Sequence, residues 1–145
     1  MAQGVKRFIF KELVEGDFRK FFAQSNDTDS GGGARDLRYK PQKEFYPFFE
    51  KMMIEKDNSG KLKDKFHWII NGKEVTTKFI VHPPTNSRPN EIRIGQVNKC
   101  IPDEAVPDVH TNTIFLIVQL DDLTIWPYFV TYDSIENEDW DPIVK

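Results

Sequence analysis

The chain has 145 residues, of which 39% are hydrophobic and 13% aromatic, enough for one ordinary domain with a core. The formal net charge is −3, no apolar run approaches the roughly 20 residues of a membrane span, and the first residues lack the apolar segment of a signal peptide. A single cysteine, Cys100, cannot form an internal disulfide, and no Cys/His cluster indicates zinc. We expect one domain over residues 1–145, no contact with a membrane, and a reducing, cytoplasmic setting.

The first half of the chain predicts short strands, loops and one helix. Residues 5–14 begin as a strand, whereas residues 17–24 are too short and too aromatic to assign to either a helix or a strand. Asn, Asp, Ser and Gly dominate residues 25–33, which predicts a loop. An extended segment follows at residues 37–40, and residues 44–55 have the apolar spacing of a helix.

The middle of the chain predicts a hairpin and a further strand. Residues 66–81 contain two apolar runs around the dipeptide Asn71-Gly72, which is typical of a two-residue hairpin turn. Three prolines exclude regular structure over residues 82–90, because proline fixes φ and removes a backbone donor. Residues 91–97 alternate between apolar and polar side chains and predict a strand.

The last third of the chain predicts two paired strands and a tail. Residues 113–120 indicate a buried strand, Asp121-Asp122 a turn, and residues 124–131 the returning strand. Residues 135–140 fit either a terminal helix or an irregular tail. About seven short strands with one or two helices predict a mainly β fold, an antiparallel barrel or sandwich.

Charge is distributed unevenly along the chain. Residues 1–78 hold 16 Lys and Arg against 12 Asp and Glu, whereas residues 79–145 hold 4 against 11. Such asymmetry is one sign of a polyanion partner. The alternative is a chance clustering of solvated lysines.

The glycine-rich stretch does not fit a phosphate or calcium loop. A nucleotide-binding loop needs Lys and Ser or Thr after its last glycine, but Gly33 precedes Ala34 and Arg35. The spacing of Asp27 and Asp29 is similar to that of a calcium loop. Its expected bidentate glutamate falls on Arg38, which would repel the ion.

No other segment predicts an active site. The commonest metal-dependent nuclease pattern needs an acidic residue two positions before a lysine, and no lysine here meets it. His67, His82 and His110 lack metal-ligand spacing, and Cys100 is typical of a small buried residue. The sequence therefore favours a binding module, with no cofactor and no metal.

Three segments resemble the N-terminal domain of the EcoRII family of restriction endonucleases. Residues 26–41 carry the motifs NDT, GG and YKP of its first DNA-contacting arm. Residues 90–94, NEIRI, are similar to its second arm, and residues 116–126, with LIVQLD and IW, to its central strand pair. Order and spacing agree over most of the chain.

The resemblance implies a DNA-binding pseudobarrel of seven strands and two short helices, whose two arms grip the major groove of double-stranded DNA. It further implies a recognition or effector-binding role that regulates a separate nuclease domain or subunit, with no catalytic residue in this chain. Three positions depart from the family pattern. Ala34 replaces a histidine, Ile92 replaces a lysine, and the arginine before Asn-Glu is displaced to Arg88. The base sequence read by this chain need not be that of the family.

Residue chemistry suggests how the two arms would act. Glycines let a loop approach phosphates closely, and Arg35, Arg38 and Arg93 supply forked donors that match guanine. Acidic residues at such a face would accept from cytosine or orient an arginine. We expect Arg35 and Arg93 to project side by side into one concave, positive surface. The predicted DNA-binding residues are Lys20, Asn26, Asp27, Thr28, Gly32, Gly33, Ala34, Arg35, Asp36, Arg38, Tyr39, Lys40, Lys43, Arg88, Asn90, Glu91, Arg93 and Gln96.

Alternatives remain open at two levels. For Arg38 and Arg93 the alternative is a pair of simple solvent-facing strand residues, and Tyr39 fits the core better than a stacking role. At the level of function, the second hypothesis is a non-catalytic protein-interaction or inhibitor domain. Its contact would use the acidic second half, namely Asp103, Glu104, Asp108 and residues 136–141.

Overall fold

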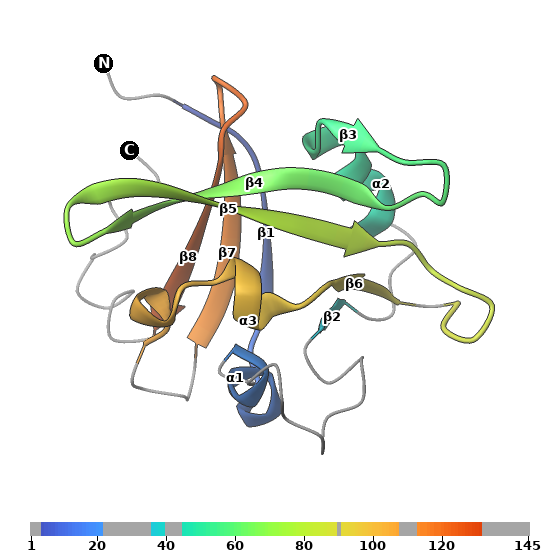
Figure 1. Cartoon of the computed structure of the whole chain (residues 1–145), viewed down its shortest axis with the longest axis horizontal. Helices are drawn as coiled ribbons and strands as arrows, with labels where there is room; N and C mark the ends of the chain where they lie inside the picture. Colours follow the sequence, from blue (N-terminus) through green and yellow to red (C-terminus); the bar gives the residue numbers. More distant parts are fainter. Residues whose placement is uncertain (1–3, 22–35, 40–44, 90, 108–112, 132–145) are drawn as a thin grey trace.

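Alternating apolar and polar side chains build one sheet in the computed structural model, which describes residues 4–21, 36–39, 45–89, 91–107 and 113–131 (Figure 1). Eight strands and three short α-helices form in these residues, with one 3₁₀ helix, η2. The strands are β1 (Val5–Glu12), β2 (Leu37–Tyr39), β3 (Glu55–Lys56), β4 (Leu62–Ile70), β5 (Lys73–His82), β6 (Ile92–Ile94), β7 (Thr113–Leu120) and β8 (Ile125–Thr131). The helices are α1 (Glu15–Phe21), α2 (Phe45–Met52), α3 (Val97–Cys100) and η2 (Asp103–Ala105).

The sheet is nearly closed into a barrel. Its strand order is β1-β7-β8-β4-β5-β6-β2, and β3 pairs with β4 beside this path. Every pairing is antiparallel except the short parallel contact of β4 with β8, at Phe66 and Ile125. In Figure 1 the long β4–β5 hairpin runs across the view, and β1, β7 and β8 run roughly perpendicular to it. The predicted mainly β pseudobarrel of about seven strands with short helices is confirmed.

The β4–β5 hairpin forms around the predicted turn. Asn71 and Gly72 have φ values of 51° and 78°, the left-handed conformation that a two-residue turn between twisted strands requires. Leu62 pairs with Val81, so the strands pair along their whole length. In β4, Leu62, Phe66 and Trp68 are buried, and in β5 Phe79 and Val81 are buried, while the residues between them are exposed or half-buried.

The core is aromatic. Phe66 of β4 stacks on Phe79 of β5, with ring centroids 3.7 Å apart. Phe115 of β7 meets Phe66 edge-on at 6.4 Å and lies 5.0 Å from Phe129 of β8. These rings join four strands, from two hairpins that are distant in the sequence, and aromatic pairs add about 0.5–1.5 kcal/mol each beyond their buried area.

Local chemistry explains the segment that the sequence left unassigned. Residues 15–21 form helix α1, in which Phe18 and Phe21 lie three positions apart and are both buried. Asp17 accepts a hydrogen bond at 3.1 Å from the backbone N–H of Val14, the residue before the helix. A carboxylate in the first turn also interacts favourably with the helix dipole.

The strand expected over residues 91–97 is shorter than predicted. β6 ends at Ile94, and Val97 already begins α3. Between them Gln96 has a φ of 46°, a left-handed conformation that breaks the alternation. The expectations for residues 25–33 and 135–140 lie outside the described residues. Among the described helices, none combines the length and apolar character that crossing a bilayer requires.

Candidate nucleic-acid interface

The β2–β6 pairing brings two distant arginines together. Arg38 of β2 and Arg93 of β6 are directly opposite each other in the ladder. Their flanking residues, among them Leu37 and Ile94, are fully buried, so the two arginines share the outward face. The segments that carry the first-arm and second-arm motifs therefore lie side by side at these residues. Arg35 lies outside the described residues, so its position beside Arg93 stays a prediction.

A buried carboxylate fixes Arg93. Asp36 is only 5% exposed. One carboxylate oxygen accepts a hydrogen bond from an Arg93 Nη at 3.0 Å, and the other accepts from the backbone N–H of Gln96 at 3.0 Å. A charge-assisted bond of this length holds the guanidinium in one orientation. Asp36 therefore orients an arginine. The sequence allowed an acidic residue at this face either this role or the role of an acceptor for cytosine.

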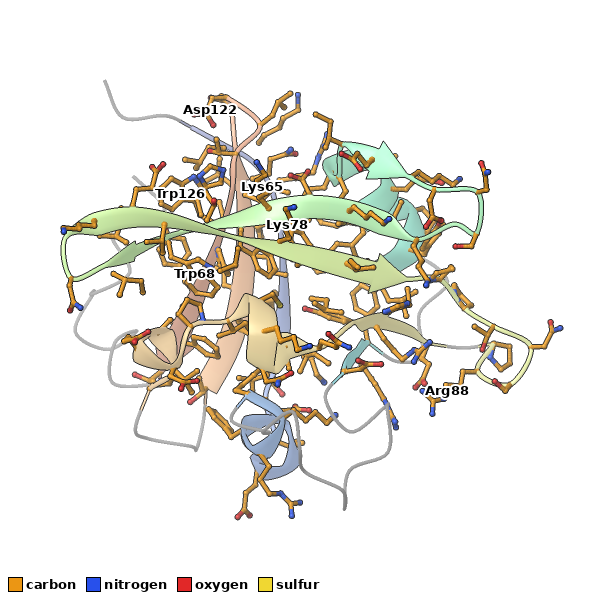
Figure 2. The ribbon with its side chains drawn as sticks, viewed as in Figure 1. Lys65, Trp68, Lys78, Arg88, Asp122 and Trp126 are labelled. Carbon is orange, nitrogen blue, oxygen red and sulfur yellow. The ribbon has the colours of Figure 1, made fainter. Side chains whose placement is uncertain are left out.

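A second buried carboxylate lies between two further arginines. Glu91 is 5% exposed, and its Oε1 lies 3.6 Å from Nε of Arg88 and 4.0 Å from Nε of Arg38. The Nε of Arg38 is buried, and it has no hydrogen-bond partner within the described part of the chain. We call Arg38, Arg88 and Arg93 the arginine cluster. Figure 2 shows Arg88 at the end of the molecule where β2 and β6 lie.

The loop before β6 is ordered by its own hydrogen bonds. Thr85 and Arg88 exchange backbone hydrogen bonds at 3.2 and 3.0 Å, and the Thr85 hydroxyl also accepts from the Arg88 N–H at 3.1 Å. The loop therefore holds Arg88 at a defined position next to Glu91. As predicted, residues 83–89 form no helix or strand, but the expectation was wrong for His82, which is the last residue of β5 because it pairs with Arg93 of β6.

Together these elements line a polar hollow of about 500 Å³. Its walls come from three segments, with the residues Asp36, His82, Thr85, Ser87, Arg88, Arg93 and Gln96. His82 pairs directly with Arg93 in the β5–β6 ladder. Burial and, secondarily, the nearby Arg93 charge lower the pKa of His82 below its usual range, whereas Asp36 opposes that shift. The imidazole is therefore neutral near pH 7.

Gly95 is required where β6 leaves the hollow. A Cβ at this position would lie 2.5 Å from Nε2 of His82. Only a residue without a side chain lets the chain pass this ring undisturbed. Gly95, His82, Thr85 and Ser87 were not among the predicted site residues. In the sequence, these residues were marked only by lying within a few positions of Arg88 or Arg93. The pairing of β5 with β6, which brings His82 beside Arg93, could not be predicted from neighbouring residues.

Two predicted residues are placed differently from the arginine cluster. Tyr39 is 1% exposed and packs edge-on against Phe45 and Phe49, with centroids 5.1 and 5.6 Å away. Burial raises the pKa of its phenol far above the usual range. Its inclusion as a DNA-contacting side chain is corrected, because the alternation of β2 turns it into the core. Lys20 lies on α1, where its Nζ is 3.5 Å from the buried Asp17.

The remaining predicted positions lie outside the described residues, and their assignments stay predictions. They are Asn26, Asp27, Thr28, Gly32, Gly33, Ala34, Arg35, Lys40, Lys43 and Asn90.

The described residues offer little catalytic chemistry. They contain no group of three or more His, Cys, Asp or Glu that could hold a metal ion. Cys100 is buried, and burial raises the pKa of its thiol to about 12. A thiol with such a pKa stays protonated at neutral pH and is a poor nucleophile.

No family profile, curated protein or solved structure matches this chain. The likeness to the EcoRII N-terminal domain therefore rests on the sequence motifs alone, and what it implies about function is a proposal.

Proposed function

We propose that this chain binds double-stranded DNA sequence-specifically in the major groove, as the recognition or effector-binding domain of a restriction endonuclease system. The observation that carries the proposal is the arginine cluster. Three guanidinium groups from two distant segments share one surface, with two buried carboxylates within 4.0 Å of them, and one of these carboxylates, Asp36, accepts a hydrogen bond from Arg93. A separate nuclease domain or subunit would perform the cleavage.

The arrangement suits base readout. Arginine pairs with O6 and N7 of guanine through two parallel hydrogen bonds, worth about 1–3 kcal/mol of discrimination per good pair. This discrimination requires a guanidinium plane that is fixed before binding, since a free side chain would lose rotamer entropy on contact. The hydrogen bond from Arg93 to Asp36 provides such a restraint. Arg93 is therefore the favoured base-reading residue.

Arg88 suits a different role. Its side chain is 37% exposed, against 17% for that of Arg93, and it stands at the rim of the hollow. Phosphate contacts come mostly from such accessible cations and position a protein without reading sequence. We assign Arg88 to the DNA backbone, next to the base-directed Arg93.

The test begins with selection of bound duplexes from a random pool by the unmodified protein. Arg93→Lys, which keeps a cation beside the buried Asp36 but removes the forked donor, should then relax the preference at one base pair by about 1–3 kcal/mol. Arg88→Ala should weaken all duplexes alike and reduce the salt slope by about one. Arg19→Ala, an exposed arginine on α1, is the matched control and should change neither quantity.

The outcome that overturns the proposal is equally clear. If the unmodified protein is not retained on heparin and shifts no duplex at low salt, the chain does not bind DNA. Lys20→Ala is a poor probe of phosphate contact, because it would also remove a partner of the buried Asp17.

One observation favours the second candidate, a non-catalytic protein-interaction or inhibitor domain. Phe8 and Phe10 of β1 are 56% and 52% exposed at one end of the sheet. They lie opposite Val118 and Leu116 of β7, which are buried in a second, smaller apolar cluster. Absence of heparin retention, of a gel shift and of any selected duplex would favour this candidate over DNA binding.

A further inference from the structure

Two lysines face each other across the β4–β5 hairpin. Lys65 and Lys78 are directly opposite in the ladder, and both are exposed. Directly opposed residues have Cβ atoms about 5 Å apart, and like charges in such positions destabilise a sheet. Within the described part of the chain, neither ammonium group has an ion-pair partner within 4.0 Å. Figure 2 shows both residues over the middle of the hairpin.

Nearby carboxylates serve other groups. Asp64 accepts a hydrogen bond from the backbone N–H of Ile54 at 3.0 Å. Asp57 accepts from the N–H groups of its own turn, and its remaining ion pair is with Lys63 at 3.8 Å. Glu55 lies opposite Lys63, not opposite Lys65 or Lys78, in the β3–β4 ladder. The shallow hollow beside the two lysines, of about 640 Å³, is lined by three lysines and two carboxylates, and within the described residues neither carboxylate forms an ion pair with Lys65 or Lys78, so its wall is positive on balance.

This wall continues the outward face that carries the arginine cluster. Lys78, Ile80 and His82 are alternate residues of β5 and lie on one face of the strand. His82 pairs with Arg93, which pairs with Arg38. Lys78 and His82 are four positions apart, which corresponds to roughly 13 Å along the strand. This distance is close to the width of the major groove, about 12 Å.

We infer that Lys65 and Lys78 form a phosphate-binding pair for the DNA backbone that borders the groove entered by the arginine cluster. The inference rests on the proposed function and extends its footprint beyond the two arms. A bound phosphate would lie between the two ammonium groups and relieve their repulsion. Lysine, a flexible and strongly hydrated point charge, suits contact with a backbone of variable position.

The experiment compares two double variants on a duplex selected by the unmodified protein. Lys65→Gln/Lys78→Gln removes the pair. Lys6→Gln/Lys73→Gln removes the same charge from exposed sites on β1 and at the tip of the hairpin, where Lys73 is roughly 17 Å along the strand from Lys78. Affinity is measured from low to moderate salt. The thermal midpoint of each variant is also measured.

The pair variant should lower the slope of log affinity against log salt by about 0.9 per lysine. At about 0.1 M salt this corresponds to a loss of affinity of one to two orders of magnitude, equal for all sequences, with the base preference unchanged. Its thermal midpoint should stay the same or rise, because a like-charge pair has been removed. The control variant should keep the original slope.

Two failures can be told apart. If the unmodified protein binds no duplex, the proposed function itself is wrong and this inference falls with it. If it binds and the pair variant keeps the slope and affinity of the control variant, only the lysine pair is excluded from the interface.

Discussion

The arginine cluster and the Lys65–Lys78 pair lie on one outward face, but their charges are held in opposite ways. In the cluster, the buried carboxylates of Asp36 and Glu91 lie within 4.0 Å of the guanidinium groups. At the lysine pair, two lysines lie opposite each other in the ladder, and the neighbouring carboxylate of Asp64 accepts a hydrogen bond from the backbone. A fixed cation suits the reading of bases, whereas a mobile one suits contact with phosphates.

The largest expected effect tests whether the cluster is structural as well as functional. Asp36→Ala leaves the Arg93 guanidinium without its partner and the Gln96 N–H without its acceptor. Breaking a buried pair in this way costs about 3–5 kcal/mol. Urea denaturation should show this loss in the free energy of unfolding. Lys65→Gln is the matched change at the other site and should stay within about 0.5 kcal/mol of the unmodified protein. If Asp36→Ala and Lys65→Gln lowered the free energy of unfolding by the same amount, the contrast between the fixed arginines and the unfixed lysine pair would be wrong.

A smaller effect is expected at the wall of the hollow. Gly95→Ala forces its new methyl group against the His82 ring, at a nominal 2.5 Å. The ring or the strand must move, which costs about 1–3 kcal/mol. His82→Ala should recover part of the loss when combined with Gly95→Ala, since the clashing ring is then absent. Additive losses in the double variant would show that the backbone at residue 95 is constrained by something else.

The smallest effect is a dependence of stability on pH. The folded state lowers the pKa of His82 below its unfolded value, chiefly by burial. The unfolded chain therefore binds more protons at mildly acid pH. The stability associated with a neutral His82 is fully present above the unfolded pKa of about 6.5 and is lost as pH falls through the folded value. The thermal midpoint should decrease between pH 7.5 and pH 5.5, and His82→Gln should weaken that decrease. An unchanged pH profile in the variant would show that His82 does not titrate in this range.

The sequence determined the parts of this protein whose physical causes are local. Short apolar runs bounded by turn residues marked parts of β4, β7 and β8, and Asn71-Gly72 marked the hairpin turn, because apolar runs and positive φ are properties of neighbouring residues. The same reasoning predicted a mainly β barrel-like fold. It left α1 unassigned because a segment of seven residues with two buried phenylalanines is too short to show a clear helical repeat of apolar side chains.

Tertiary structure alone decided which charges meet. Asp36 and Arg93 are 57 positions apart, and only the β2–β6 and β5–β6 registers bring them and His82 to one hollow. The β2 register likewise turned Tyr39 into the core. The opposition of Lys65 and Lys78 is different, because the two-residue turn at Asn71-Gly72 sets the register of that hairpin locally. A shift of one residue in any ladder would reverse the face of every side chain on that strand, and this choice depends on the packing of the whole barrel rather than on any short segment.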